Sequence, residues 1–545
     1  MDLSRNIAVT TFFTGAVAPD ASIVLRLSAR IHRPKVRLLA MSRNPKLCAV
    51  AGPMSECSYP SLYQINTRVW LTELSRSLGR PATLDDIPEV QLDQWAALGV
   101  DWVWLLSVWQ TGAAGKFVSR TNPAWRRQFL QILPDLQEDD IQGSGFAITD
   151  YKVSEAMGND AAMARLRDRL QDRGLRLMLD FVPNHTALDH VWIRDNSAVY
   201  LSGTLQDLLQ SPANYQYIHT AAGERLFAHG RDPYFPGWPD TLQLDYSNAL
   251  TQQAMATELL RIARRCDGVR CDMAMLILPD VFERTWGRRP APFWNSALLQ
   301  VREQLPAFCF MAEVYWDLEW AMQQLGFDYA YDKRLYDRLR DGLARPVREH
   351  LTAGIDYQRR LARFLENHDE PRAAATFPGN KHRAAAIITY LTPGLRFFQE
   401  GQLEGRTRWV SPHLVRRPLE AVNTELQTFY RKLLDTLRQP AVRKGQWQLL
   451  DCTPAWDGNW THDCFITWVW HIQDEDPLFV AVNFSGNQSQ CYTRIPVTGL
   501  AGRNVRLADT MSDARYDRAG NDLLGSGLYL DMPPWGYQAL RITAS

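Results

Sequence analysis

Residues 268–274, GVRCDMA, place an arginine and an aspartate two positions apart inside an otherwise apolar run. The stretch follows the helix-like segment TELLRIARRCD, so it is predicted to be a strand that enters a hydrophobic core. Alternate residues of a strand share a face, so Arg270 and Asp272 point in the same direction. Burying two opposite charges seldom stabilises a fold, which favours a chemical role for this pair over a role as structural counter-ions.

The same alternation of apolar strand and amphipathic helix continues over about 380 residues. Strands that alternate with helices indicate parallel βα units. Eight strand candidates occur, which is the number that a closed barrel needs, so we expect a (β/α)8 TIM barrel of the α/β class over residues 56–440. The candidates are 61–71, 99–108, 174–182, 268–274, 307–316, 326–332, 361–367 and 394–401.

Three other segments depart from this alternation. Residues 186–245, after the third strand, are rich in glycine, proline and aromatic residues, which predicts an inserted B domain that carries function. Residues 441–545 contain short alternating segments separated by turn residues, typical of a separate C-terminal all-β sandwich domain. Residues 1–55 show no period and are predicted to be a poorly ordered N-terminal extension.

Composition excludes several classes of partner. Sixty basic and sixty acidic side chains give no net charge, so nucleic acid is not expected as a partner. No run of 18 apolar residues exists, so we expect no membrane partner. The eight cysteines form no CxxC pair, and the apolar N-terminal stretch is a poor signal peptide because Asp2 offsets Arg5. We therefore expect a cytoplasmic protein without a disulfide framework; the sequence gives no oligomeric state.

Acidic residues lie late in several predicted strands. Asp272, Glu313 and Asp369 end the fourth, fifth and seventh strands, and barrel enzymes build their sites at that end. The third strand adds residues 180–185, DFVPNH, to the same rim. One such carboxylate alone is more often a cap or an ion-pair partner. Their joint occurrence, in order and at strand ends, favours a catalytic site.

Two carboxylates in different environments suit the cleavage of a glycosidic bond. The charge of Arg270 is expected to lower the pKa of Asp272 and keep it ionised as nucleophile or base. The apolar neighbours of Glu313 are expected to raise its pKa, so that it serves as the acid. These neighbours are Phe310, Val314 and Trp316.

The motifs DFVPNH, GVRCDMA, AEVYW and FLENHDEPR resemble, in order, the four signature regions of the α-amylase family of glycoside hydrolases, family 13. WPDTLQLD and GFAITDY resemble two further signatures, and the resemblance covers about residues 59–545. It implies that Asp272 is the nucleophile, Glu313 the general acid/base and Asp369 the stabiliser of the transition state. It further implies a set of substrate-binding residues: Phe146, Asp180, His185, Arg270, His368 and Arg372.

The sequence also departs from the family pattern. Phe146 replaces a tyrosine, Ala147 replaces an aspartate, and Ser107 stands where proline is common. The stretch MAMLIL after the nucleophile lacks the lysine–histidine pair of many amylases, which argues against endo-hydrolysis of polymers. Asn184 matches a common calcium-binding position. We expect no required cofactor, and a structural calcium ion at Asn184 remains an open alternative.

The resemblance therefore implies a retaining α-glycoside hydrolase of carbohydrate metabolism. It would act on α-glucosidic oligosaccharides or disaccharides through a covalent glycosyl-enzyme intermediate. A transferase of the same family, in which a sugar hydroxyl replaces water, has identical catalytic residues and remains an alternative. A catalytically silent carbohydrate-binding scaffold is the alternative of another class, and the intact Asp–Glu–Asp set argues against it.

Overall fold

The computed structural model describes residues 58–544, so the predicted extension 1–55 lies outside the described residues. Eight parallel strands close into a barrel in the order β1-β14-β13-β12-β11-β10-β5-β2. This confirms the predicted (β/α)8 barrel. The strands are β1 (Ser61–Asn66), β2 (Trp102–Leu106), β5 (Arg176–Phe181), β10 (Gly268–Cys271), β11 (Cys309–Ala312), β12 (Tyr329–Tyr331), β13 (Leu361–Arg363) and β14 (Leu395–Gln399).

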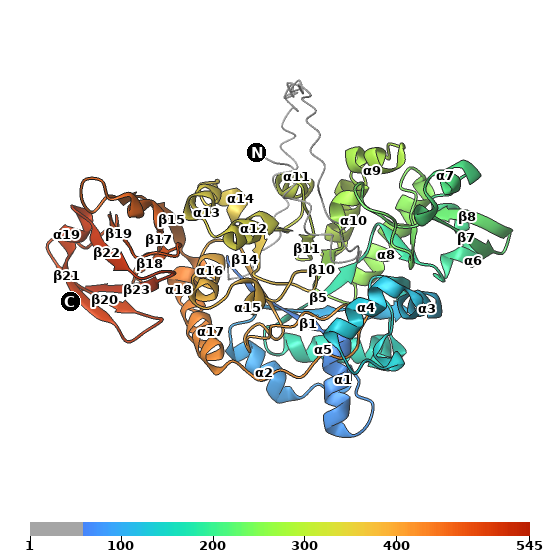
Figure 1. Cartoon of the computed structure of the whole chain (residues 1–545), viewed down its shortest axis with the longest axis horizontal. Coiled ribbons are helices and arrows are strands. Elements are labelled where there is room, and N and C mark those ends of the chain that lie inside the picture. The colour runs from blue at the N-terminus through green and yellow to red at the C-terminus, as the bar shows by residue number, and fades with distance from the viewer. Residues whose placement is uncertain (1–57, 545) are drawn as a thin grey trace, which may run out of the picture.

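Helices surround the barrel (Figure 1). The larger ones are α1 (Thr67–Leu78), α2 (Glu89–Ala97), α5 (Asn159–Gln171), α8 (Ala249–Ala263), α9 (Pro279–Trp286), α10 (Trp294–Gln304), α11 (Glu319–Leu325), α12 (Lys333–Asp341), α13 (Ala344–His350), α16 (Asn380–Tyr390) and α17 (Thr424–Leu437). The first predicted strand, 61–71, is wrong in its second half. Asn66 ends β1 and caps α1, because its side chain accepts a hydrogen bond from the Val69 amide at 3.3 Å.

An excursion after β2 was not predicted. It contains β3 (Trp109–Thr111), α3 (Ala113–Thr121), α4 (Pro123–Ile132) and β4 (Ile148–Val153), and β3 pairs antiparallel with β4. The loop 400–423 after β14 packs against it: Arg416 forms ion pairs with Asp140 and Asp135 at 2.7 and 2.9 Å. Two segments far apart in sequence therefore form one wall at the mouth of the barrel.

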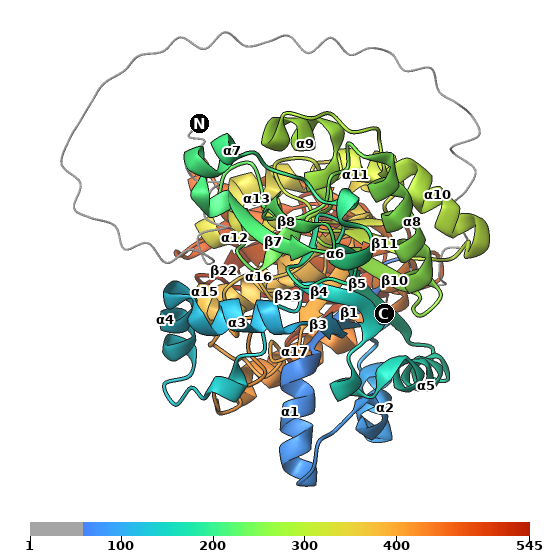
Figure 2. The ribbon, with the colours of Figure 1, turned by 90° about the vertical axis from the view of Figure 1, so that its right-hand side faces the viewer.

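The predicted insertion 186–245 also lies at the barrel mouth, next to the excursion, where the Ala114 amide donates to Asp189 Oδ2 at 3.0 Å. Its elements are β6 (His185–Ala187), α6 (Trp192–Asp195), α7 (Leu205–Gln210), β7 (Tyr215–Thr220), β8 (Gly223–Ala228) and β9 (Thr241–Gln243). β6 pairs with β9, so the two ends of the insertion lie side by side, while β7 and β8 form an outer hairpin. Figure 2 shows α6, β7 and β8 in front of the barrel.

The C-terminal region contains two sheets, of order β15-β17-β18-β23-β20-β21 and β16-β19-β22. An apolar core separates them, in agreement with the predicted all-β region. The strands are β15 (Gln446–Leu450), β16 (Cys452–Thr453), β17 (Phe465–His471), β18 (Leu478–Asn483), β19 (Ser489–Thr493), β20 (Asn504–Asp509), β21 (Arg515–Ala519), β22 (Leu528–Met532) and β23 (Tyr537–Ala544).

The larger of these sheets also packs against the barrel. Trp468 and Trp470 of β17 are fully buried and belong to the same apolar cluster as the barrel strands. The indole of Trp470 donates to the Leu391 carbonyl at 2.7 Å and meets the ring of Tyr59 edge-on at 4.9 Å. Both faces of the sheet are therefore covered, so the β-region shares its core with the barrel.

Two general observations complete the fold. No helix within residues 58–544 is long and apolar enough to cross a membrane. The six cysteines in this part of the chain are free thiols, and three of them, Cys266, Cys271 and Cys309, are buried close to or within barrel strands.

We expect that a chain ending at residue 440 does not form a stable barrel, because it exposes the surface that Trp468 and Trp470 cover. Trp470→Ala in the full chain should lower the free energy of unfolding by about 3–5 kcal/mol, measured by urea denaturation. Trp456→Ala, at a side chain that is 53% exposed, is the control and should change little. A soluble, cooperatively folded fragment 58–440 would contradict this prediction.

Candidate active site

A cavity of about 560 Å³ opens at the carboxyl ends of the barrel strands. Asp272, Glu313 and Asp369, the three predicted catalytic residues, all line it. They follow β10, β11 and β13, and each is at least four-fifths buried. Because parallel barrel strands end at one face, three residues separated by 41 and 56 positions reach the same cavity.

Arg270 contacts two of these carboxylates, those of Asp272 and Glu313. Its Nη1 lies 2.7 Å from Asp272 Oδ1 and 3.4 Å from Asp180 Oδ1, and its Nη2 lies 2.6 Å from Glu313 Oε2. The side chain is 1% exposed and does not line the cavity. The shared face predicted for Arg270 and Asp272 is thus observed, and the same guanidinium also holds Glu313.

Aromatic rings fix the position of this guanidinium. The ring centroids of Trp104 and Phe146 lie 5.4 and 5.2 Å from it. Phe146 also stacks on His368, with ring centroids 5.2 Å apart and an interplanar angle of 29°. A cation near aromatic faces gains electrostatic attraction without a second anion. Phe146, which lines the cavity, therefore supports both Arg270 and His368.

The pKa of Asp272 differs from the prediction. Burial raises it above its ordinary value of 3.8, and the attraction of Arg270 opposes this effect without reversing it. The expected net lowering was wrong because the carboxyl group is deeply buried and shares its cation with other carboxylates. Asp180, in the same network, has its pKa raised to about 7 by burial, again against the effect of Arg270.

Glu313 lies in a polar network rather than in an apolar pocket. Its Oε1 accepts a hydrogen bond from the Tyr315 hydroxyl at 2.7 Å, and its Oε2 accepts one from the Met273 amide at 2.7 Å. Burial is the main cause that raises its pKa, and the charge of Asp272 raises it further. The predicted direction and the predicted cause, loss of solvation, both agree. Polar groups nevertheless contact the carboxyl itself, and Phe310 packs its ring against Phe308 at 5.0 Å.

Asp369 lies on a loop, because β13 ends at Arg363. Asn367 shapes this loop: its Oδ1 accepts hydrogen bonds from the Asp369 and Glu370 amides, both at 2.9 Å. Burial raises the pKa of Asp369 well above 3.8, and the charge of Glu313 adds to the effect. Asp369 therefore reaches the cavity through a side-chain-capped turn and not through the predicted strand.

Two neutral histidines line the cavity beside the carboxylates. Burial lowers the pKa of His185 to about 3 and that of His368 well below 6.5. Gln64 Nε2 lies 3.0 Å from His368 Nδ1, and His368 Nε2 lies 3.2 Å from Asp369 Oδ2. When the Gln64 amide donates to Nδ1, the ring proton is on Nε2, which lies near Asp369 but has no hydrogen-bond partner among the described residues. Sequence reasoning missed Gln64.

Non-glycine residues with positive φ follow the strands that end at the mouth. Ser107 (φ 65) follows β2, Met273 (φ 40) follows β10, and Trp316 (φ 64) and Asp317 (φ 63) follow β11. Such conformations are costly and concentrate at functional sites. At Met273 the turn aims the backbone amide at Glu313. At Ser107 it explains one departure from the family, because proline cannot adopt this φ.

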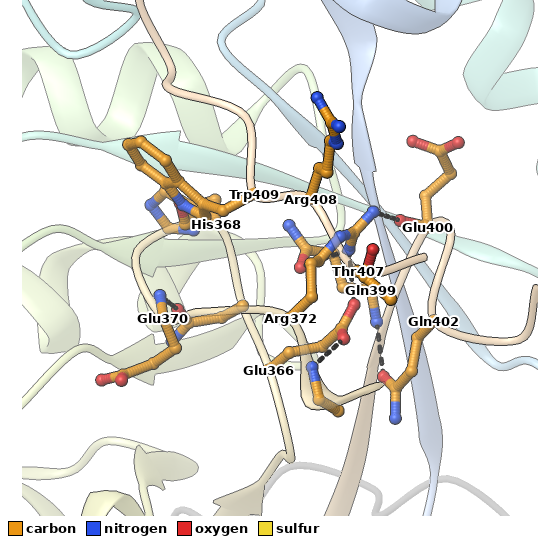
Figure 3. Close-up of polar contacts among 12 residues, drawn as sticks. Glu366, His368, Glu370, Arg372, Gln399, Glu400, Gln402, Thr407, Arg408 and Trp409 are labelled. Carbon is orange, nitrogen blue, oxygen red and sulfur yellow. Dashed lines mark hydrogen bonds and ion pairs between the residues drawn. The ribbon is translucent and has the colours of Figure 1, made fainter. Parts of the chain in front are cut away.

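Arg372 does not line the cavity. Its guanidinium forms an ion pair with Glu366 and donates to Gln399 Oε1 and the Glu400 carbonyl, both at 2.8 Å (Figure 3). The side chain is buried, so it anchors the loop after β14. Trp409 of the same loop donates its indole proton to the His368 carbonyl at 2.6 Å. Neither Arg372 nor Asp180 lines the cavity, and their predicted contacts with a substrate stay a prediction.

The residues around Asn184 do not fit a calcium ion. Gln243 Nε2 donates to Asn184 O, Asn184 Oδ1 and Leu244 O, at 2.9, 3.0 and 3.0 Å. An amide nitrogen therefore occupies the point on which three oxygens converge, where a hard cation would need to sit. Within residues 58–544 no group of three or more acidic, histidine or cysteine side chains could hold a metal ion.

Several cavity residues were not foreseen from the sequence. They come from α4, from the end of the insertion and from the loop after β14, and include Trp125, Asp232, Tyr234, Trp238, Asp240 and His413. The signal available was compositional, since residues 228–241 are rich in glycine, proline and aromatic side chains. That signal predicts a functional loop but not which of its side chains face the cavity.

The chain is similar to known α-amylases. The family model described as "Alpha amylase, catalytic domain" matches residues 84–231. Alpha-amylase 3 of Dictyoglomus thermophilum is 21% identical over 311 residues, which cover 52% of this chain and 59% of that protein. Alpha-amylase MalA of Haloarcula japonica is 22% identical over 354 residues, which cover 63% of this chain and 44% of that protein. The chain thus spans about half the length of these two relatives.

Similarity of fold extends over more of the chain. The solved structure of the noncanonic maltogenic α-amylase AmyB from Thermotoga neapolitana superposes with a TM-score of 0.64. The two chains are 17% identical, and the match covers 90% of this chain and 99% of that one. The barrel, the insertion and the C-terminal β-region therefore form one known architecture.

We expect calcium to have no effect on stability, because the Gln243 amide already satisfies the oxygens around Asn184. Adding calcium or a chelator should leave the melting temperature unchanged. Gln243→Ala should lower the free energy of unfolding by about 1–3 kcal/mol, because three buried acceptors lose their donor. Gln252→Ala, at a partly exposed glutamine, serves as the control. A calcium-induced rise of more than about 3 °C in the wild type would contradict the prediction.

Proposed function

We propose that this chain, a member of the α-amylase family of glycoside hydrolases, cleaves α-glucosidic oligosaccharides or disaccharides with retention of configuration. The observation that carries the proposal is the guanidinium of Arg270, which holds Asp272 and Glu313 side by side at the floor of a cavity. Retaining cleavage needs two such carboxyl groups, one to attack and one to donate a proton.

Asp272 is the nucleophile in this proposal. Arg270 holds its Oδ1 at 2.7 Å, which leaves Oδ2 to attack the anomeric carbon. The bond from the anomeric carbon to the leaving oxygen breaks as the bond to Asp272 forms, giving a covalent glycosyl-enzyme intermediate. Because Arg270 is fixed by Trp104 and Phe146, the attacking oxygen is aimed before the substrate arrives.

Glu313 supplies and then recovers the proton. Its Oε2 already accepts hydrogen bonds from Arg270 and Met273, so the proton is carried on Oε1 and passes to the leaving oxygen. The resulting carboxylate then removes a proton from water, whose oxygen attacks the anomeric carbon and frees Asp272. A protonated Glu313 is consistent with its raised pKa.

Asp369 and the two histidines complete the binding of the reacting sugar. Asp369, with His368 Nε2 at 3.2 Å from its Oδ2, faces the cavity from the loop after β13 and accepts hydrogen bonds from ring hydroxyls. His185 lines the cavity from β6 and donates or accepts as a neutral ring. These contacts strengthen as positive charge develops on the sugar.

The dimensions and lining of the cavity favour short substrates. Its volume of about 560 Å³ falls in the range of small-ligand sites, about 300–1,000 Å³. The rings of Tyr234 and Trp316 meet edge-on at 5.2 Å between the insertion and the loop after β11. Both rings line the cavity, so they border the space available to a longer chain.

Transfer to a second sugar is the other candidate activity. The first half of the reaction is identical, and a sugar hydroxyl then replaces water as the acceptor. Four aromatic residues of the cavity favour it, because rings bind a sugar face and exclude water. They are Tyr234, Phe235, Trp238 and Trp316.

The test is incubation with a panel of α-linked glucosides, sucrose and trehalose, with and without acceptor sugars. We expect the first product to be a sugar in the α-configuration, which proton NMR measures. Asp272→Asn should reduce kcat by at least about 10³-fold and leave the melting temperature nearly unchanged. Asp207→Asn, at an exposed helix cap in the insertion, is the matched control. Absence of cleavage and transfer, or a β-configured first product, would refute the proposal.

The pH profile should reflect two raised pKa values. Asp272 must be ionised, so kcat/KM falls as pH drops through its pKa, which lies above 3.8. Glu313 must be protonated, so kcat/KM falls as pH rises through its pKa, which lies above 4.5. Tyr315→Phe should shift the alkaline limb upward, because the Tyr315 hydroxyl stabilises the charged form of Glu313. A profile that stays flat down to about pH 4 would contradict this assignment.

A further inference from the structure

One loop of the insertion, residues 229–241, forms a closed wall of the cavity. His229 Nδ1 lies 2.8 Å from the Thr241 carbonyl, and the Gly230 amide donates to Thr241 Oγ1 at 3.0 Å. The Trp238 amide donates to the Gly230 carbonyl at 2.8 Å. A Cβ atom at Gly230 would lie 2.8 Å from the Cβ of His185, so the base of the loop rests directly on this histidine.

Two aspartates of this wall have an oxygen without a partner. Asp232 and Asp240 are 1% and 3% exposed, and both line the cavity. Asp232 Oδ1 accepts hydrogen bonds from the Tyr234 and Phe235 amides at 2.7 and 3.0 Å, while its Oδ2 has no partner within residues 58–544. Asp240 Oδ2 likewise has none in the described part of the chain.

Arg231, the neighbour of Asp232 in sequence, is directed elsewhere. Arg231 donates to the Thr285 carbonyl at 2.8 Å, and its guanidinium lies 4.6 Å from the centroid of the Trp286 ring. Burial raises the pKa of Asp240 to about 7, and no cation contributes. A buried carboxyl oxygen without a donor destabilises the free protein. Two such oxygens, on residues that line the same cavity, therefore point to a ligand that brings its own hydrogen-bond donors.

We propose that Asp232 and Asp240 form a hydroxyl-binding wall, in which each free Oδ2 accepts a hydrogen bond from a hydroxyl group of the sugar in the cavity. The inference rests on the proposed function, to which it adds the contacts that the insertion makes with the sugar. Trp238, between the two aspartates in sequence, lies 5.1 Å from the ring of His185 and supplies an apolar surface for the sugar. Rings combined with a few polar groups are typical of ligand sites.

The chemistry of the wall selects a neutral polyol. Carboxyl oxygens accept hydrogen bonds from hydroxyls, whereas a phosphate or carboxylate group on the ligand would be repelled. A hard metal ion would need several more oxygen ligands, and the described residues contain no group of three or more acidic, histidine or cysteine side chains that could hold one. The wall therefore favours hydroxyl groups over anionic groups on its own side of the cavity.

The experiment compares Asp232→Ala and Asp240→Ala with the full-length wild type on the best α-glucoside of the panel. Each variant should reduce kcat/KM at least tenfold, mainly through KM. Asp240→Ala should keep or raise the melting temperature, because a buried unpaired carboxyl oxygen is removed. Asp232→Ala should lower it, because the Tyr234 and Phe235 amides lose their acceptor. Asp245→Ala is the matched control. Asp245 is a buried aspartate of the insertion whose Oδ2 is paired with Arg288 at 2.6 Å. That control should lower the melting temperature and leave KM unchanged.

Monodeoxy substrates identify the hydroxyl groups. One deoxy substrate should lower the kcat/KM of the wild type by the same factor as Asp240→Ala lowers kcat/KM on the full substrate. On that deoxy substrate, Asp240→Ala should show no further loss. A merely structural role of Asp240 would produce additive losses at every position. Variants that retain KM within twofold while the wild type cleaves its substrate would overturn the wall and leave the proposed function intact.

If the wild type cleaves none of the panel, the proposed function fails and the wall is tested by binding. Glucose, maltose and maltotriose are then added in thermal denaturation of the wild type and both variants. Protection of the wild type that is lost in both variants supports the wall. No protection of the wild type overturns it. A rise in melting temperature with calcium that disappears in Asp240→Ala also overturns it, because the ligand is then a cation.

Discussion

The site depends on one guanidinium that lies among more carboxyl groups than it can neutralise. Arg270 contacts Asp180, Asp272 and Glu313 directly, and its charge also acts on Asp369. Because all of these groups are buried, the pKa of each of the four carboxyls is raised above its ordinary value despite the charge of Arg270. Burial of several carboxyl groups around a single cation thus provides, in one site, a carboxyl that can act as nucleophile and another that can donate a proton.

The barrel explains how these groups come together. Each critical side chain is on or directly after a different strand, and the turn after the strand sets its direction. Met273, in the left-handed region, aims its amide at Glu313, and Asn367 caps the turn that carries Asp369. The cost of these conformations is offset by the surrounding packed core. Rigidity of the mouth therefore follows from the closed sheet beneath it.

The sequence predicted the parts of the molecule that depend on local pattern. Strand spacing identified the eight strands, and strand ends identified Asp272 and Glu313 as neighbours in space. It failed where the outcome depends on burial or on distant partners. The net pKa of Asp272, the anchoring role of Arg372 and the excursion after β2 each arise from contacts between segments far apart in the chain.

The short strand β9 holds two parts of the insertion in place: the residues around Asn184 and the loop that carries Asp232 and Asp240. Gln243, at its end, donates to both oxygens of Asn184 and so fixes the residue next to His185 without an ion. Thr241, at its start, accepts from the Gly230 amide and closes the loop that carries Asp232 and Asp240. Because β9 also pairs with β6, which begins at His185, the base of the wall and the histidine lie side by side. The Gln243 amide therefore adds hydrogen bonds to the apolar packing of Leu242 and Leu244 that joins the insertion to the barrel, and the base of the wall starts from the same strand.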